Sequence, residues 1–339
     1  MIDKKTAMEL KELIDAANTI AIISHRSPDA DTIGSNLALR EIFENHDKKV
    51  ISLCYDSVPS QMDFLTKEEE TSEQNDNGLS SKQSDFTEKF QKETDFDLCD
   101  VIICLDAASE AQTVFLEKYP ELLDGQTPVI NIDHHVSNSR YGMINLVIPE
   151  AASTTLIIYH LLKIWGEKIN EKTATALMAG LYFDTGSFMH SNTDGNVYQA
   201  GGELLLMSAK RDVITKNLFR TSSIEKLKLL GKILSNVTQT PKGVAFSCVT
   251  QKDLQKNNLR CGDASGAIDY LNTVKNSLFA AMLVEDDKNN IRGSFRTRND
   301  DVNLSELACF LGGGGNKKAS GFQIEGRLKK EVEWKVETG

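Results

Sequence analysis

The sequence predicts an α/β protein with a mostly parallel, wound sheet in its first part and a smaller α/β domain in its second. Short apolar runs alternate with amphipathic stretches, as strands and helices do in such sheets. Aspartate and histidine residues follow several of these runs, and a basic, glycine-rich segment marks the second part. We expect a first domain over residues 1–190, a linker over 191–222 and a second domain over 223–339.

The first part contains a regular succession of expected elements. Asp3 is a plausible N-cap for the first helix. We expect strands over residues 19–24, 50–54, 100–105 and 128–132, helices over 3–17, 32–45, 109–119, 153–165, 171–183 and 195–209, and a connecting stretch over 210–222. Residues 66–97 are acidic and poor in apolar side chains, which indicates a flexible insertion, with a functional lid as the alternative.

The second part is expected to form a separate unit. Its strands are predicted over residues 244–249, 278–284 and 290–298, and its helices over 223–235, 264–273 and 304–310. The last helix leads into the glycine-rich run over residues 312–322.

Composition limits the classes of protein. Hydrophobic residues make up 40% and charged residues 26% of the chain, as in soluble globular proteins, and no apolar run is long enough to span a membrane. The six cysteines form no C-x-x-C pair and no signal peptide is visible, so we expect a cytoplasmic protein.

Charge is distributed unevenly along the chain. Residues 1–225 carry 20 basic and 36 acidic side chains, a net charge of −16, whereas residues 226–339 carry 18 and 13, a net charge of +5. The acidic part contains the candidate metal ligands, and the basic part could hold an anion. The alternative is that most of these charges form an ordinary solvated surface.

Metal-ligating side chains recur just after the predicted strands. His25, Asp29 and Asp31 follow the first strand, Asp106 follows the third, and the run Asp133-His134-His135 follows the fourth. The carboxyl ends of parallel strands meet at one edge of a sheet, so these turns are expected to converge, and Asp184 at a helix end could join them. Each aspartate alone could instead be a turn former or helix cap.

A cluster of carboxylates cannot ionise fully without a cation. Mixed aspartate and histidine ligation suits Mn²⁺, Mg²⁺, Fe²⁺, Co²⁺ or Zn²⁺, and the excess of carboxylates favours Mn²⁺. One aspartate bridging two ions would create a site for attack on a phosphoryl group by metal-bound hydroxide.

The basic second part has the composition of an anion site. Arg292, Arg296 and Arg298 alternate along one predicted strand and are therefore expected to share a face. The successive glycines Gly313, Gly314 and Gly315 would allow backbone N–H groups to approach a phosphate closely. A solvated, charged strand edge is the alternative.

These motifs together resemble a known superfamily. The set His25-x-x-Pro28-Asp29-x-Asp31, Asp106, Asp133-His134-His135 and Asp184-Thr185-Gly186 is similar to the four motifs of the DHH phosphoesterases. The run from Gly312 to Asn316, with Ala319-Ser320-Gly321, resembles the signature of the associated DHHA1 domain. The neighbouring residues and the length most resemble the nanoRNase/pAp-phosphatase branch.

The resemblance implies roles for individual residues. One of two divalent metal ions would take His25, Asp29 and Asp106, and the second would take Asp31, Asp106, His134 and Asp184, with Asp106 bridging. His135 would contact the scissile phosphate or assist the leaving group, and Asp133 would orient a histidine. The substrate would be held by Arg292, Arg296, Arg298, Gly313, Gly314, Gly315, Asn316 and Ser320.

The implied activity is hydrolysis of short oligonucleotides to mononucleotides, or of 3′-phosphoadenosine 5′-phosphate to AMP. A cyclic dinucleotide phosphodiesterase, a single-strand exonuclease, an inorganic pyrophosphatase and a catalytically weak nucleotide sensor remain as alternatives. No membrane or long duplex nucleic acid is expected as a partner, and a homodimer is left open. The chain departs from the family pattern at one position, because Asn316 stands where the family usually has histidine. Unlike histidine, asparagine cannot carry a charge.

Overall fold

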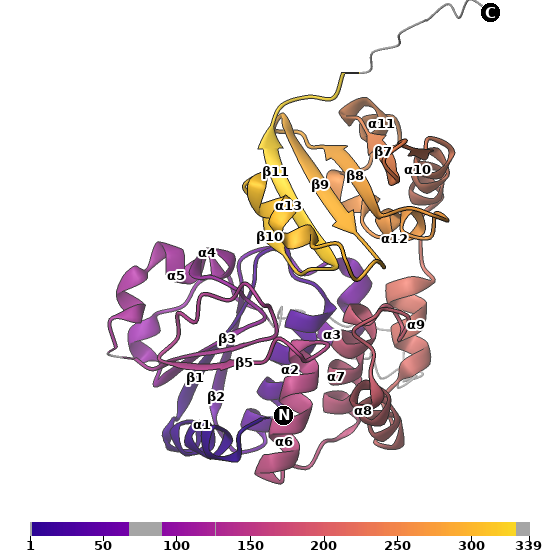
Figure 1. Cartoon of the computed structure of the whole chain (residues 1–339). Helices are drawn as coiled ribbons and strands as arrows, with labels where there is room; N and C mark the ends of the chain where they lie inside the picture. Colours follow the sequence, from indigo (N-terminus) through magenta and orange to yellow (C-terminus); the bar gives the residue numbers. More distant parts are fainter. Residues whose placement is uncertain (1, 68–89, 126, 330–339) are drawn as a thin grey trace, which may run out of the picture. The chain divides into compact units, whose positions relative to one another are not determined.

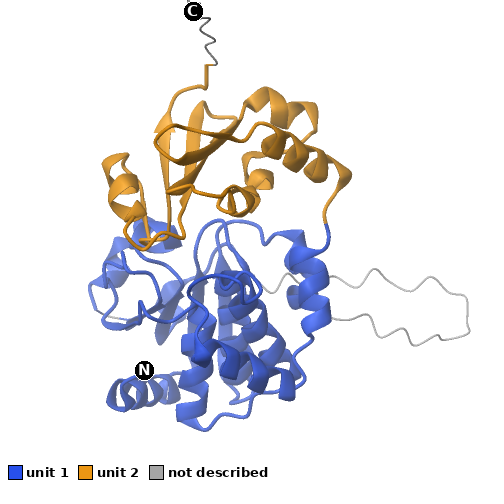
Figure 2. Ribbon diagram, turned by 45° about the vertical axis from the view of Figure 1, so that its right-hand side comes forward, with its two compact units in different colours: residues 1–221 blue, residues 222–339 orange. Residues whose placement is uncertain are grey.

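The structure is a computed structural model that describes residues 2–67, 90–125 and 127–329. The chain divides into two compact units, Met1–Thr221 and Ser222–Gly339 (Figure 2). None of the described helices combines the length and the apolar character that a membrane span requires.

Unit 1 contains a five-stranded, fully parallel sheet in the order β2-β1-β3-β4-β5 (Figure 1). Its strands are β1 (Thr19–Ser24), β2 (Lys49–Cys54), β3 (Val101–Leu105), β4 (Val129–Asp133) and β5 (Ile144–Val147). The chain passes from β1 to a neighbour on one side and then crosses to β3 on the other. This order places a topological switch point between β1 and β3, where wound sheets form a crevice beyond their carboxyl ends.

Each face of this sheet is covered, which explains why its strands are continuous apolar runs. One face packs on the long helices of unit 1 through Ile22, Ile103 and Ile132. The other packs on Phe96, Phe115 and Leu116. The helices of unit 1 are α1 (Lys4–Ala16), α2 (Ala30–Glu44), α3 (Asp63–Thr66), α4 (Glu110–Thr113), α5 (Phe115–Lys118), α6 (Thr154–Trp165), α7 (Glu171–Asp184), α8 (Gly195–Leu206) and α9 (Arg211–Phe219).

The strands and long helices expected in unit 1 are confirmed, including the Asp3 cap, whose side chain accepts from the Thr6 amide. Two local expectations are wrong, and one strand was not predicted. The helix expected over 109–119 is broken at Val114, which has a φ of 63°. The connecting stretch over 210–222 contains α9, and the short, half-buried edge strand β5 was not predicted because its period is weak.

The expected insertion over 66–97 lies largely outside the described residues. Its end is ordered, because Phe90 is buried in the core and the backbone of Gln91 pairs with β2. Residues Phe96–Leu98 form a 3₁₀ turn leading into β3.

Unit 2 contains a six-stranded mixed sheet in the order β10-β11-β9-β8-β7-β6. Only β7 and β8 pair in parallel, and the other neighbours are antiparallel. The strands are β6 (Thr238–Gln239), β7 (Val244–Val249), β8 (Phe279–Glu285), β9 (Asn290–Arg296), β10 (Gly314–Gly315) and β11 (Ala319–Glu325). The helices are α10 (Ile224–Ser235), α11 (Gln251–Lys256), α12 (Ala267–Leu271) and α13 (Leu304–Phe310).

The sheet of unit 2 separates two apolar clusters. Leu229, Ile268 and Met282 belong to one, and Ala281, Phe295 and Leu304 belong to the other. The expectation that three arginines alternate within one strand is wrong for Arg298, because β9 ends at Arg296. Strand β11 was not predicted, since its glycine-containing start has no strand-like apolar pattern.

Candidate metal centre

The predicted ligands of unit 1 lie close together. They come from the turns that follow β1 and β3, from the end of β4 and from the last residue of α7. Three groups of side chains have potential ligand atoms within 4.8 Å of one another. They are His25, Asp29 and Asp106; Asp31, His134 and Asp184; and Asp106, Asp133, His134 and His135. The cluster therefore forms at the switch point, where the strand order places it.

His25 and Asp29 each form hydrogen bonds within the fold through one polar atom and direct a second polar atom toward the cluster. Nδ1 of His25 lies 2.7 Å from the Arg26 carbonyl oxygen, which can only accept, so Nδ1 carries the proton. Oδ1 of Asp29 caps α2 by accepting from the Asp31 and Thr32 amides at 2.9 and 3.2 Å. His25 Nε2 lies 3.7 Å from the other Asp29 oxygen.

Asp106 divides its two carboxylate oxygens between two sides of the cluster. Oδ2 lies 3.4 Å from Nε2 of His25. Oδ1 lies 3.5 Å from Nε2 of His134 and accepts from the Thr154 hydroxyl at 3.0 Å. Asp106 is buried and has a φ of 59°, a left-handed conformation that directs the side chain from the strand end into the cluster. This is the arrangement required of a bridging carboxylate.

The third group is anchored on α6 and α7. Asp31 is fully buried, and its oxygens accept from the Thr154 and Thr155 amides and the Thr155 hydroxyl at 2.6, 2.9 and 2.6 Å. These amides begin α6, whose N-terminus favours a negative charge. Nδ1 of His134 faces the Ala151 carbonyl oxygen at 3.3 Å, and its Nε2 lies 3.3 Å from Asp184.

Asp133 and His135 form a tightly bonded pair beside this group. One oxygen of Asp133 accepts from the His134 amide and faces Nδ1 of His135, both at 2.7 Å. The other accepts from the Asn138 amide group at 2.6 Å. Asp133 is fully buried, and its hydrogen bonds hold the His135 ring and the His134 amide in place.

The charges of the cluster shift the pKa values of its members in different directions. Burial, reinforced by Asp106 and Asp29, raises the pKa of Asp31, and burial with the neighbouring carboxylates raises the pKa of Asp184. Burial lowers the pKa of His134, which favours the neutral, ligating imidazole. Burial would lower the pKa of His135, but its hydrogen bond to Asp133 and the charge of Asp106 raise it to about 9.

The donor set fits divalent cations. Ligand atoms about 2.1 Å from one ion are separated from one another by roughly 3.0–3.4 Å in octahedral or tetrahedral geometry. The distances from the histidine Nε2 atoms to the facing carboxylates are 3.3–3.7 Å, close to that range. Carboxylates in such number, with the pKa values of Asp31 and Asp184 raised, call for a compensating positive charge.

Sequence reasoning missed the residues that support the ligands. Residues Ala151 and Thr154 supply carbonyl, amide and hydroxyl groups to the ligands, a role that their sequence pattern does not indicate. Nothing in the sequence pattern distinguishes Gly180 on α7. A Cβ there would lie 2.6 Å from Oδ1 of Asp31 and 2.5 Å from Cγ2 of Thr155, so the helix can pass the site only with glycine.

The glycine run of unit 2 has a different character from the predicted phosphate loop. A Cβ on Gly313 would lie 2.1 Å from the Gly321 carbonyl oxygen, and one on Gly315 would lie 2.7 Å from the Ala319 carbonyl oxygen. These two glycines are therefore required for the close approach of β10 to β11. Only Gly314 of the three predicted glycines faces open space.

The structure separates the other predicted residues of unit 2. Arg296 pairs in register with Ala319, and Thr297 donates to the Lys318 carbonyl, so Arg296 and Arg298 adjoin the turn that follows Asn316. Arg292 pairs with Gln323, four residues along β9, which is roughly 13 Å away at 3.3 Å per residue. Ser320 is buried and donates its hydroxyl hydrogen to the Leu304 carbonyl at 2.7 Å, a bond that ties β11 to α13.

Fold and site define a class of proteins in which a wound parallel sheet carries a carboxylate–histidine cluster able to bind divalent metal ions. The N-terminal domain model of the DHH family matches residues 19–181, and the DHHA1 domain model matches residues 242–335. The chain belongs to the DHH family of phosphoesterases, enzymes that hydrolyse phosphoester bonds with divalent metal ions, and it carries a DHHA1 domain.

Relatives along almost the whole chain support this placement. Proteins named bifunctional oligoribonuclease and PAP phosphatase NrnA, from Thermus thermophilus and Bacillus subtilis, are each 28% identical to it. The matches cover 91% and 93% of this chain and 84% and 92% of those proteins. A crystal structure of an exopolyphosphatase-related protein from Bacteroides fragilis has a TM-score of 0.81 and 26% identity, covering 97% of this chain and 93% of that one.

Proposed function

We propose that this chain hydrolyses short oligonucleotides to mononucleotides, 3′-phosphoadenosine 5′-phosphate to AMP, or both. The names of the relatives that match almost the whole chain include these two activities. The observation that carries the proposal is the position of Asp106, whose two oxygens face two different histidines at 3.4 and 3.5 Å. A single carboxylate placed in this way can serve two ions at once.

Two ligand sets follow from this arrangement. His25, Asp29 and Asp106 would hold one ion. Asp31, His134 and Asp184, with Asp106 shared, would hold the other. The excess of carboxylates over imidazoles favours Mn²⁺ among the divalent cations. Two such ions would neutralise the phosphate and lower the pKa of the attacking water.

The protein groups around the ions would orient and protonate the substrate. His135 is 31% exposed in its side chain, and Asp133 holds its Nδ1–H, which leaves Nε2 for a phosphate oxygen or the leaving group. In the absence of metal ions, the pKa of about 9 keeps this imidazole positively charged near pH 7. Thr154 and Thr155 would keep Asp31 and Asp106 in place as the charge distribution changes during the reaction.

The second unit would contribute the grip on the nucleotide. Arg296 and Arg298 adjoin the turn that begins at Asn316, and the backbone of Gly314 faces open space beside it. Oδ1 of Asn316 is buried without a hydrogen-bond partner among the described residues. We therefore place the nucleotide contacts at this end of the sheet and leave Ser320 to its structural bond.

A substrate panel tests the proposal. The purified chain, loaded with Mn²⁺, should hydrolyse dinucleotide and pentanucleotide RNA or 3′-phosphoadenosine 5′-phosphate, with about two metal equivalents per chain by elemental analysis. Cyclic di-AMP and pyrophosphate complete the panel. Tight nucleotide binding with no turnover in Mn²⁺, Mg²⁺ or Co²⁺ would identify a sensor instead, and exclusive turnover of cyclic di-AMP or pyrophosphate would also refute the proposal.

A further inference from the structure

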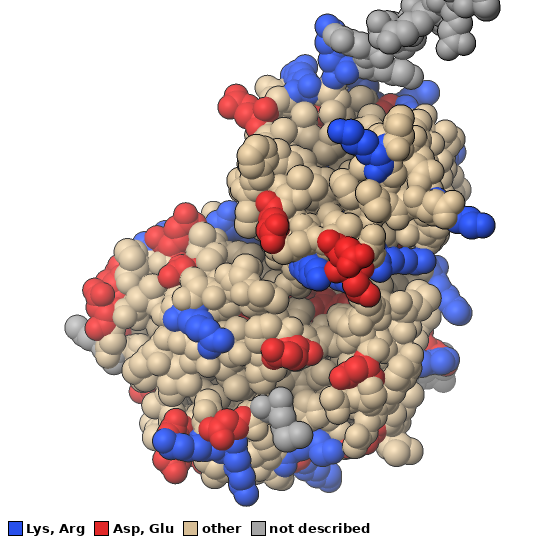
Figure 3. All heavy atoms as spheres, viewed as in Figure 1, with Lys and Arg blue, Asp and Glu red and all other residues tan. Residues whose placement is uncertain are grey.

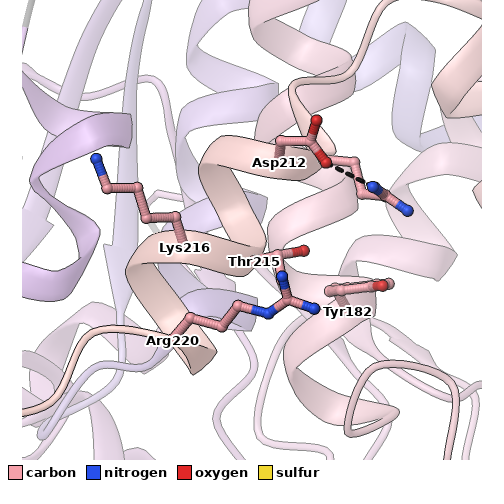
Figure 4. Close-up of a pocket in the computed structure, with 6 residues that line it drawn as sticks. Tyr182, Asp212, Thr215, Lys216 and Arg220 are labelled. Atoms are coloured by element: carbon pink, nitrogen blue, oxygen red, sulfur yellow. Dashed lines mark hydrogen bonds and ion pairs between the residues drawn. The ribbon is translucent and has the colours of Figure 1, made fainter.

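Unit 1 contains a second basic site, away from the metal ligands. A cavity of about 460 Å³ is lined by Tyr182, Arg211, Asp212, Thr215, Lys216 and Arg220 (Figure 4). Five of these residues lie on α9 or directly after it, and none of them belongs to the metal-ligating groups. Its three basic side chains stand out because this part of the chain is strongly acidic overall.

Two of the three positive charges are not neutralised. Arg211 is paired with its neighbour Asp212, whose Oδ1 lies 3.1 Å from Nε of the guanidinium. For the side chains of Lys216 and Arg220, no ion pair or hydrogen bond is found within the described ranges 2–67, 90–125 and 127–329. Figure 4 shows the Arg220 guanidinium beside Thr215 and directed toward Tyr182, whereas the Lys216 side chain extends in the opposite direction, to another part of the lining. Free arginine and lysine groups in one hollow are the usual means of binding a phosphate.

The neutral groups of the cavity strengthen this interpretation. Oγ1 of Thr215 is buried and has no hydrogen-bond partner in the part of the chain that the structure describes. A buried hydroxyl without a partner is costly, and such groups usually find a ligand or water. The ring of Tyr182 is fixed by edge contacts with Phe188 and Phe219, with centroids 5.0 and 5.8 Å away. This side of the cavity is therefore preorganised.

The cavity also adjoins the metal centre through α7. Tyr182 lies two residues before Asp184 on the last turn of this helix, so their Cα atoms are roughly 5 Å apart by helix geometry. Two residues correspond to a rotation of about 200°, so the two side chains leave α7 on nearly opposite sides. A chain of phosphodiesters with one phosphate at the metal centre would therefore pass around the end of α7 at Asp184 to reach the cavity with another.

We propose that this cavity binds a phosphate group of the oligonucleotide that is not itself hydrolysed. The inference rests on the proposed function, because it concerns another part of the same substrate. Lys216 and Arg220 would supply the charge, with the Thr215 hydroxyl as an additional donor. The site would favour substrates with several phosphates over a single dinucleotide linkage.

Binding is tested in a background that cannot turn over. Asp106→Asn protein is titrated into a fluorescent pentanucleotide, and anisotropy gives the Kd at several salt concentrations. Adding Arg220→Gln or Lys216→Ala should raise the Kd about tenfold and reduce the salt dependence, because a phosphate contact is lost. Lys172→Ala is the matched control, since it removes a positive charge from the opposite end of α7 and should leave the Kd within about twofold.

Kinetics on the otherwise unchanged enzyme distinguish a substrate site from an effector site. The increase in KM caused by Arg220→Gln should be larger for the pentanucleotide than for the dinucleotide. Equal binding of the pentanucleotide by both pocket variants and the control would overturn the inference. So would a loss of sensitivity to added free nucleotide with no change in oligonucleotide binding. Anisotropy measures binding and needs no hydrolysis. The test therefore still gives a result if the chain binds oligonucleotides without hydrolysing them.

Discussion

The metal centre of unit 1 and the glycine-rich turn of unit 2 use their polar groups in opposite ways. In the centre, His25, Asp29 and His134 each satisfy one polar atom within the fold and leave a second one free. In the turn, Gly313, Gly315 and Ser320 are occupied by packing or hydrogen bonding inside the unit. The first arrangement is specialised for a ligand, whereas much of the second is explained by the approach of two strands.

This difference shows which sequence patterns are reliable evidence for a functional site. A ligand set delivered by several separate turns has no common structural purpose, so its convergence indicates chemistry. A glycine run has an alternative purpose in close packing, which here accounts for two of its three predicted members. We therefore expect substitutions in the centre to affect the reaction strongly and substitutions near the turn to affect mainly substrate binding.

The largest effect is expected for Asp106→Asn. This change removes the negative charge that faces both His25 and His134 but retains the shape of the side chain. We expect kcat to fall by at least about 10³-fold and the bound metal to fall below two equivalents per chain. Steady-state kinetics and elemental analysis measure these quantities.

Asp100→Asn is the matched control for that substitution. Asp100 lies at the opposite end of the same strand and accepts from the Asn18 and Thr19 amides at 2.8 and 2.9 Å. Its loss should reduce stability slightly and leave kcat within about twofold, because exposed charge interactions contribute little. Comparable activity in the Asp106→Asn and Asp100→Asn proteins would show that the centre is not catalytic.

The next effect concerns a residue that touches no substrate. In Gly180→Ala, the new Cβ would meet Oδ1 of Asp31 and both branches of Thr155 at 2.5–2.7 Å. We expect activity to fall by about 10- to 100-fold through displaced ligands, and stability to fall by about 1–3 kcal/mol through overpacking. Activity at saturating Mn²⁺ and thermal unfolding provide the two readouts.

Gly202→Ala separates this effect from a general response to alanine. Gly202 lies within α8, and a Cβ there would meet no atom within 4 Å. Alanine should therefore stabilise this helix by about 0.5–1 kcal/mol and leave activity unchanged. If Gly180→Ala behaved in the same way, the close passage of α7 over Asp31 would have no functional importance.

Metal removal should affect the two regions unequally. Burial and the neighbouring carboxylates raise the pKa of Asp184 well above 3.8. An acid with a raised folded-state pKa makes the metal-free fold less stable as the pH rises from the unfolded value through the folded one. A cation removes this penalty, so the stabilisation by Mn²⁺ should increase as the pH rises from about 3.8 to the raised pKa of Asp184.

Hydrogen exchange locates this stabilisation. At a Mn²⁺ concentration about 100-fold above its Kd, the gain should approach about 2.7 kcal/mol. Amides of α2, α6 and α7, which carry or hold the ligands, should become more protected than in a chelator. Those of β8 and β9 should not change. Equal protection of both regions would contradict a centre built within unit 1 alone.

The sequence predicted the positions of the ligands better than their supports. Alternating strands and helices required a switch point near β1, and the residues after the strands could be placed there. The role of Gly180 could not be predicted, because it depends on how closely α7 passes Asp31, a distance set by tertiary packing. The same is true of α9, a short helix whose only fully buried residue is Ile214, so it gives little periodic signal.

The smallest effect is expected for the arginines of unit 2, where the sequence alone could not rank Arg292, Arg296 and Arg298. Arg296 is about two-thirds buried and lies opposite Ala319, beside the Asn316 turn, with its Nε 3.6 Å from Asp269. Burial lowers the pKa of this guanidinium, although it stays charged at any ordinary pH. Arg296→Ala should raise KM about tenfold with little change in kcat, because it would remove a binding contact rather than a reacting group.

Arg292→Ala provides the comparison for Arg296→Ala on the same strand. Arg292 is exposed and lies four residues away from the turn, opposite Gln323. Its KM should stay within about twofold of the unmodified protein, and unfolding should be unaffected. An equal rise in KM for both variants would mean that the nucleotide lies along the whole of β9, and the turn would then lose its special position in the substrate site.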